Sequence, residues 1–166
     1  MIIDISSVLK NENSRMELDK NIDLRFLEVM GGEHPFDKPF HVTGVIENKA
    51  GVVEMRLSIK GEFDTFCARC LKPVKEYLDL KSEYFLVTER QNADNDKLIL
   101  VEDNSLDLSE IVINNILIGM PLKSLCRENC KGLCPKCGKD LNLGDCDCPK
   151  KEIDSRFAVL KELLKD

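Results

Sequence analysis

The sequence predicts an α+β protein built mainly on an antiparallel β-sheet or a partly closed barrel, with one or two C-terminal helices and a cysteine-rich zinc module. Three observations support this class. Apolar and polar side chains alternate along several early segments, which is the pattern of strands with one buried face. A helical spacing of apolar residues appears only later, and six of the eight cysteines follow it, between residues 126 and 148.

The clearest strand lies between Val53 and Phe63, where apolar side chains alternate with charged and small polar ones. Residues 40–46 show the same register, and the Asn-Lys-Ala-Gly segment at 48–51 supplies a turn, so these segments predict a β-hairpin. We therefore expect an antiparallel sheet of about four or five strands. The remaining candidate strands are residues 16–26, 77–87 and 97–103.

Two helices are expected after the strands. Residues 107–119 have apolar side chains at helical spacing, Asp107 is suited to the N-cap, and Glu110 is placed to reach back to it. The end of the chain, 151–166, also has helical spacing and is expected to dock on the sheet, or alternatively on a partner. The predicted division is a β-rich domain at 1–122, the cysteine-rich module at 123–150 and a closing helix at 151–166.

Composition and charge limit the location and the partners. The first residues lack the basic and sustained apolar regions of a secretory signal, and the longest apolar stretch, 111–122, is too short to cross a bilayer. We therefore expect a cytoplasmic protein with no membrane partner. A formal net charge of -6 argues against broad nonspecific binding to nucleic acid. Any contact with RNA must be local or must pass through a basic partner.

The cysteines are expected to bind metal, because structural disulfides are rare in a reducing cytosol. Cys134 and Cys137 lie in a Cys-Pro-Lys-Cys-Gly segment, where two thiolates can chelate one ion while Gly138 allows a tight turn. This local form is typical of a knuckle in a zinc ribbon. A four-cysteine site also permits an iron–sulfur cluster, but the knuckle favours zinc.

Cys67 and Cys70 have the same spacing, which also occurs in thioredoxin-like redox pairs. Such a pair is expected at the start of a helix, whereas this one follows a predicted strand and precedes Pro73. A metal knuckle is therefore preferred over a redox pair, and two unliganded cysteines are the third option. The only histidines, His34 and His41, are expected to be ordinary surface residues.

The eight cysteines form four close pairs, enough for two structural zinc ions with four thiolates each. In the preferred partition, the first site joins the sheet to the module through Cys67, Cys70, Cys126 and Cys130. The second site is local and contains Cys134, Cys137, Cys146 and Cys148. The alternative is one zinc held by four downstream cysteines, namely Cys130, Cys134, Cys137 and either Cys146 or Cys148, with the upstream pair free. The spacing leaves both open.

Four segments occur together in one order: FCARCL after a predicted strand, the DLSEIVINNILIGMPL helix, CRENCKGLCPKCGKDLN after it, and RFAVLKELL near the end. In this combination the chain resembles the YceD family of large-ribosomal-RNA-subunit accumulation proteins. The resemblance implies a cytoplasmic, non-catalytic factor of ribosome assembly that is needed for accumulation of large-subunit ribosomal RNA. The candidate metal ligands that it carries over are Cys67, Cys70, Cys126, Cys130, Cys134 and Cys137.

The leading hypothesis is an assembly factor whose sheet and zinc module recognise pre-ribosomal large-subunit RNA or a ribosomal protein. Opposite charges favour a basic ribosomal protein at least as much as the RNA. The alternative is a zinc-dependent redox or regulatory interaction protein, in which oxidised thiols release the metal. We expect neither an enzyme nor a small-molecule substrate, because the sequence shows no nucleophile–base pair, phosphate-binding glycine loop or mixed-ligand metal site.

Overall fold

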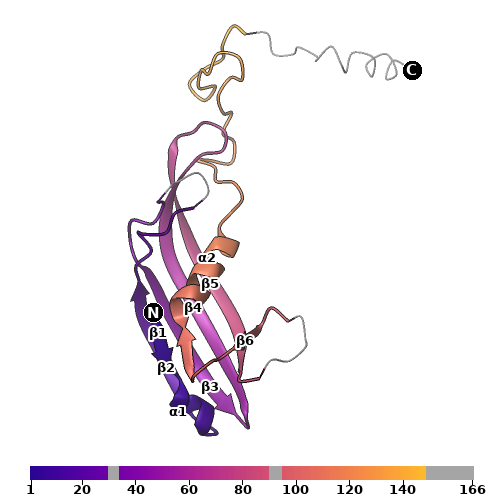
Figure 1. The fold of residues 1–166 in the computed structure, drawn as a ribbon. Helices are drawn as coiled ribbons and strands as arrows, with labels where there is room; N and C mark the ends of the chain where they lie inside the picture. The colour runs from indigo at the N-terminus through magenta and orange to yellow at the C-terminus, as the bar shows by residue number, and fades with distance from the viewer. Residues whose placement is uncertain (30–33, 90–94, 149–166) are drawn as a thin grey trace, which may run out of the picture.

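The computed structural model describes residues 1–29, 34–89 and 95–148. Five strands form the main sheet in the order β2-β3-β4-β5-β6, and β1 pairs with β7 in a small second sheet (Figure 1). The predicted closing helix at 151–166 lies outside the described residues. The elements are β1 (Ile2–Asp4), α1 (Ser6–Lys10), β2 (Arg15–Ile22), β3 (Phe40–Lys49), β4 (Val52–Phe66), β5 (Pro73–Val87), β6 (Leu98–Leu100), β7 (Ser105–Asp107) and α2 (Leu108–Gly119).

The predicted hairpin between β3 and β4 is confirmed. Lys49 pairs with Val52 across a two-residue turn at Ala50 and Gly51, whose φ values are 52° and 86°. Positive φ at both turn positions matches the right-handed twist of the strands, which is why such turns are favoured in two-residue hairpins. Ala50 adopts a conformation that glycine would occupy with less strain.

β4 and β5 are the longest strands, with 15 residues each, and they pair from Val53 and Leu86 to Phe66 and Pro73. Their far end extends past the other strands toward the cysteine-rich part of the chain (Figure 1). The loop that joins them, residues 67–72, is therefore held out by a rigid two-stranded arm. We call this loop the hairpin tip.

The sheet is open within the described residues, where β2 and β6 form its two edges. The barrel alternative is therefore wrong. Antiparallel pairing joins β2 through β5 as expected, but β6 pairs parallel to β5, so the sheet is mixed. For β6 to run parallel to β5, the connection between them must return to the end of the sheet where β5 begins to pair with β6. The alternation of apolar and polar residues within a strand does not indicate the course of the connection that follows it.

One face of the sheet is dry. Alternate residues of β3 and β4, such as Ile46, Met55 and Ile59, are fully buried, and α2 contributes Val112 and Ile116 to the same core. The opposite face carries ion pairs, including that of Lys60 with Asp79. The helix thus packs on one side of the sheet only (Figure 1).

α2 begins and ends close to the predicted residues. The Asp107 carboxylate accepts hydrogen bonds from the backbone N–H groups of Ser109 and Glu110, at 3.0 and 3.4 Å, so Asp107 is the N-cap. The N-terminal ammonium of Met1 lies 3.0 Å from the same carboxylate. These bonds fix the start of α2 beside β1. The division of the chain into a β-rich domain, a cysteine-rich module and a closing helix stays a prediction.

Candidate metal centres

The hairpin tip is a tight turn that presents Cys67 and Cys70. The N–H of Cys67 donates to the carbonyl oxygen of Lys72 at 2.8 Å, and the N–H of Leu71 donates to the carbonyl oxygen of Cys67 at 2.9 Å. Leu71 has a positive φ of 58°. Cys67 is fully buried and Cys70 is nearly so, although they lie at the end of the arm.

The segment from Cys134 to Lys139 forms the same turn. The N–H of Cys134 donates to the carbonyl oxygen of Lys139 at 2.8 Å, and that of Gly138 donates to the carbonyl oxygen of Cys134 at 2.9 Å. Gly138 has a φ of 73° and occupies the place that Leu71 holds in the hairpin tip. The chain therefore contains two knuckles of one design, which is the turn expected for two cysteines that chelate one ion.

Four sulfur atoms meet between the hairpin tip and the segment after α2. The sulfurs of Cys67, Cys70, Cys126 and Cys130 all lie within 4.8 Å of one another, and we call this group cluster 1. The Cys67–Cys130 sulfur distance is 3.8 Å and the Cys70–Cys126 distance is 3.6 Å. Ligands placed about 2.3 Å from a tetrahedral zinc lie about 3.8 Å apart, whereas disulfide sulfurs lie about 2.0 Å apart. The spacing fits a metal site.

Cluster 2 lies wholly within the module. The sulfurs of its four cysteines also lie within 4.8 Å of one another, and they belong to Cys134, Cys137, Cys146 and Cys148. All eight cysteines are free thiols, grouped as in the partition preferred from the sequence. Neither His34 nor His41 belongs to a group, so each donor set is made of sulfur alone. That these thiols hold a metal stays a prediction.

Backbone contacts attach the hairpin tip to the segments that carry cluster 1. The N–H of Ala68 donates to the carbonyl oxygen of Ser124 at 2.8 Å, and the N–H of Leu133 donates to that of Arg69 at 3.0 Å. The Arg69 guanidinium in turn donates to the carbonyl oxygen of Cys130 at 2.7 Å. The four thiols are therefore placed by an arm and a module that already contact each other.

Asn142 is a polar side chain at cluster 1 that the sequence analysis missed. Its amide nitrogen Nδ2 lies 3.5 Å from the sulfur of Cys130, and its oxygen Oδ1 accepts a hydrogen bond from the N–H of Lys131 at 2.9 Å. Arg69 was missed as well. Both residues lie in loops without periodic pattern, and the only signal was their nearness in sequence to a knuckle.

The thiols of cluster 1 differ in acidity. The backbone N–H of Cys126, with those of Arg69 and Cys70, lowers the pKa of Cys67 to about 6. The neighbouring Cys70 raises the pKa of Cys126 to about 12. Because thiolates in contact repel one another, the four groups cannot all ionise without a cation between them, and a divalent metal removes that obstacle.

Cluster 2 repeats this arrangement. The backbone N–H groups of Cys137 and Lys136 lower the pKa of Cys134 to about 6. The sulfur of Cys137 raises the pKa of Cys148 to about 12. Both clusters therefore combine one acidic thiol, stabilised as a thiolate by backbone N–H groups, with one thiol whose ionisation its neighbours oppose.

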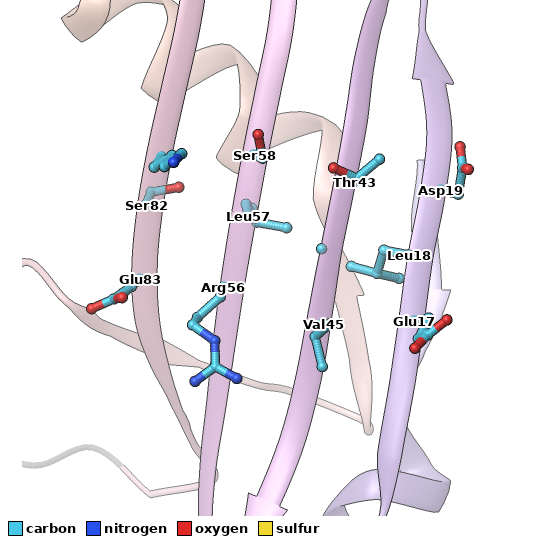
Figure 2. A pocket seen from close by; sticks show the side chains of 12 residues that line it. Glu17, Leu18, Asp19, Thr43, Val45, Arg56, Leu57, Ser58, Ser82 and Glu83 are labelled. Atoms are coloured by element: carbon cyan, nitrogen blue, oxygen red, sulfur yellow. The ribbon is translucent and has the colours of Figure 1, made fainter.

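A separate pocket of about 530 Å³ lies over the middle of the sheet. Figure 2 shows Arg56 and Glu83 beside small and apolar side chains such as Val45 and Leu57. Arg56 forms ion pairs with Glu47 and Glu54, so its charge is already compensated. The residues that line this pocket include no cysteine or histidine, and it lies apart from both clusters.

Among the described residues, no helix has both the length and the apolar character needed to cross a membrane.

Comparison with known proteins points to one family. A family model described as "Large ribosomal RNA subunit accumulation protein YceD" matches residues 55–164, a range that contains all eight cysteines. The Bacillus subtilis protein YlbN is 29% identical over 151 residues, which cover 90% of this chain and 88% of YlbN. No solved structure matches the chain significantly.

More distant relatives share only part of their length with this chain. A Mycobacterium tuberculosis protein, Rv2926c, is 32% identical over 102 residues, which cover 59% of this chain and 49% of that protein. An Arabidopsis thaliana protein named "Large ribosomal RNA subunit accumulation protein YCED homolog 1, chloroplastic" is 32% identical over 62 residues, 37% of this chain and 19% of that protein.

Proposed function

The chain belongs to the YceD family, and from this membership we propose that it is a non-catalytic factor of ribosome assembly that supports accumulation of large-subunit ribosomal RNA in the cytoplasm. The observation that carries the proposal is the family match over residues 55–164, together with the two four-thiol clusters inside it. A site closed by four thiolates leaves no position for a substrate, so these centres support a structural role better than a catalytic one.

We assign one structural zinc ion to each cluster. When bound, zinc supplies the positive charge that allows four thiols to ionise together. The chain supplies the geometry, because the knuckles preset two ligands of each site and the arm of β4 and β5 delivers Cys67 and Cys70 to cluster 1. Four sulfurs at tetrahedral spacing fit zinc or iron, and the knuckle form of the two cysteine pairs favours zinc.

The proposed recognition surface is the hairpin tip and the module around it. The apolar side chain of Leu71 is exposed on the hairpin tip, and that of Phe66 is exposed immediately before it. Exposed apolar side chains that gather at one place support contact with a partner. The hairpin tip and residues 123–148 together contain seven basic and four acidic side chains, and eight thiolates on two divalent ions add four negative charges, so the loaded surface is nearly neutral. The net charge of -6 over the whole chain favours a basic ribosomal protein at least as much as the RNA as the direct partner.

Depletion followed by complementation tests the proposed role. Loss of the protein should lower the ratio of large-subunit to small-subunit ribosomal RNA, and the wild-type chain should restore it. A Cys67→Ser, Cys70→Ser double variant should fail to restore it, whereas Leu100→Ala, a change beside the end of β5 opposite the hairpin tip, should succeed. An unchanged RNA ratio on depletion would contradict the role.

Affinity capture with and without ribonuclease tests the partner. A ribosomal protein that stays bound after digestion supports direct protein recognition. Loss of every ribosomal component after digestion would instead place the contact on RNA.

A second candidate function, a redox-sensitive regulator, is favoured by one feature. Each cluster has one residue at the surface, Cys126 in cluster 1 and Cys137 in cluster 2, whereas Cys130 and Cys134 are buried. An exposed thiolate is where an oxidant would attack and release the metal. If mild peroxide leaves the thiols reduced and the metal bound, this function is excluded.

A further inference from the structure

A short segment connects the two clusters. The second knuckle ends at Lys139, and the next residue, Asp140, pairs with Leu133 in an isolated antiparallel bridge. The N–H of Leu141 donates to the carbonyl oxygen of Gly132 at 2.9 Å. Residues 140–142 therefore leave cluster 2 and run directly alongside the chain that carries Cys130.

Asn142 contacts cluster 1 from this segment. Its Nδ2 group donates toward the sulfur of Cys130, and its Oδ1 accepts from the N–H of Lys131 at 2.9 Å and from the guanidinium of Arg127 at 2.7 Å. Asn142 thus points an amide donor at the sulfur of Cys130 while its amide oxygen is fixed by two neighbouring groups.

Asp140 holds Asn142 in place and contacts the hairpin tip. Its Oδ1 accepts hydrogen bonds from the backbone N–H of Asn142 at 2.9 Å and from the side-chain Nδ2 at 2.6 Å. Its Oδ2 lies 2.7 Å from the ammonium of Lys72, the residue that closes the first knuckle. The Asp140 side chain is only 13% exposed, so this ion pair is partly shielded from water.

We propose that Asp140 and Asn142 couple the two metal sites, so that a divalent metal bound at cluster 2 raises the affinity of cluster 1 for its own metal. The inference rests on the proposed zinc sites. Metal at cluster 2 fixes the second knuckle, and a fixed knuckle holds residues 140–142 against Cys130 and Lys72. By linkage, metal at cluster 1 must strengthen cluster 2 by the same factor.

The effect expected of Asn142 follows from what supporting hydrogen bonds do in metal sites. Loss of a group that orients a ligand from outside the metal's own shell costs about 10–100-fold in metal affinity. Asn142→Leu keeps the branched shape and the number of heavy atoms of the side chain but cannot donate to the sulfur. Its effect should therefore fall on cluster 1, although the residue itself lies close in sequence to the ligands of cluster 2.

The experiment is a cycle of four full-length proteins, titrated with cobalt(II) against a competing chelator. They are the wild type, the Asn142→Leu variant, the double variant that removes cluster 2 (Cys146→Ser with Cys148→Ser), and the triple variant that combines all three changes. Cobalt in a tetrahedral thiolate site absorbs visibly, and protection of individual cysteines from alkylation assigns each binding step to cluster 1 or cluster 2, so the affinity of cluster 1 can be read without any activity assay. Loss of cluster 2 should weaken cluster 1 by about 10–100-fold, and adding Asn142→Leu should weaken it little further.

A spectroscopic readout separates positioning from general loosening. A hydrogen bond to a thiolate lowers its donation to the metal, so Asn142→Leu should move the sulfur-to-cobalt charge-transfer band of cluster 1 to lower energy. Leu143→Ala is the matched control, because Leu143 is the next residue, is 81% exposed and should leave both affinity and band unchanged.

Two results would overturn the coupling. One is a cluster 1 affinity that does not change when cluster 2 is removed, and the other is fully additive losses in the combined variant. If the wild type still shows the cobalt absorption of tetrahedral thiolate sites, either result would refute the coupling but not the two metal sites. Absence of tetrahedral thiolate absorption in the wild type would overturn the metal sites and the coupling together.

Discussion

Gly132 lies at the closest approach between the hairpin tip and the module, and replacing it by alanine should separate the two. Its φ is 76°, and a Cβ there would lie 2.9 Å from the carbonyl oxygen of Arg69. That oxygen accepts the hydrogen bond from the N–H of Leu133 at 3.0 Å. The added methyl group must therefore push apart the backbone segments that hold Cys70 and Cys130 together.

The cost of Gly132→Ala has two parts. The left-handed backbone costs a residue with a Cβ about 1–2 kcal/mol. The overlap with the Arg69 carbonyl adds about 1–3 kcal/mol, the usual range for an overpacked site. A loss of roughly 2–5 kcal/mol in a chain of this size lowers the melting temperature by roughly 4–20 °C, at about 2–4 °C per kcal/mol.

Gly138→Ala is the matched control. Its φ is 73°, but no atom lies within 4 Å of the position of an added Cβ. Only the backbone cost applies, so the melting temperature should fall by roughly 2–8 °C. Calorimetric melting at one fixed concentration of free zinc measures both variants. Equal shifts for Gly132→Ala and Gly138→Ala would show that the contact with Arg69 does not constrain the fold.

Three further changes test separate contacts. Leu71→Gly should raise the free energy of unfolding by about 0–1 kcal/mol in calorimetric melting, because relief of the positive φ outweighs the entropic cost of glycine. The Leu71 side chain is 65% exposed. A clear loss of stability would show that the backbone at Leu71 is not strained. Asn48→Ala should lower the free energy of unfolding, measured by urea denaturation, by about 1–3 kcal/mol, since Asn48 is 3% exposed and donates to the carbonyl oxygen of Val8 at 2.8 Å. An unchanged denaturation midpoint would show that this hydrogen bond contributes nothing to stability. Asp23 should titrate by NMR with a pKa of about 2 instead of 3.8, mainly through its hydrogen bonds with the Arg25 side chain, and Arg25→Met should raise this pKa toward the ordinary value, although the bond from the backbone N–H of residue 25 remains. Because the folded pKa is the lower one, the stability from Asp23 should be complete above about pH 4 and disappear as the pH falls toward 2.

The main sheet was predictable because alternation is a local property of the chain. β3 and β4 each have a dry and a wet face over many residues, and the turn at Ala50 and Gly51 fixes their register. β1 and β7 were missed, since each has only three residues and they pair across more than 100 residues of sequence, as Ile2 with Asp107 shows. α1 was missed for a similar reason: its five residues are too few for a helical period to be recognised.

The grouping of the cysteines was predictable from their spacing in pairs, together with the need for four ligands per site. What the spacing could not provide is the support around the sulfurs. Arg69 and Asn142 act through contacts that exist only once the arm reaches the module. The shared spacing of the two cysteine pairs was recognised and predicted two knuckles, but a further signal was not used: a lysine follows the second cysteine by two residues in both Cys67–Lys72 and Cys134–Lys139.

Metal content per chain tests the central claim most directly. Native mass spectrometry of the purified protein should show two zinc ions, one for each cluster of four thiols. A Cys67→Ser, Cys70→Ser double variant should retain one ion, held by the four cysteines of cluster 2. A single zinc in the wild type that is unchanged in the double variant would contradict the claim that the hairpin tip and the module share a metal site.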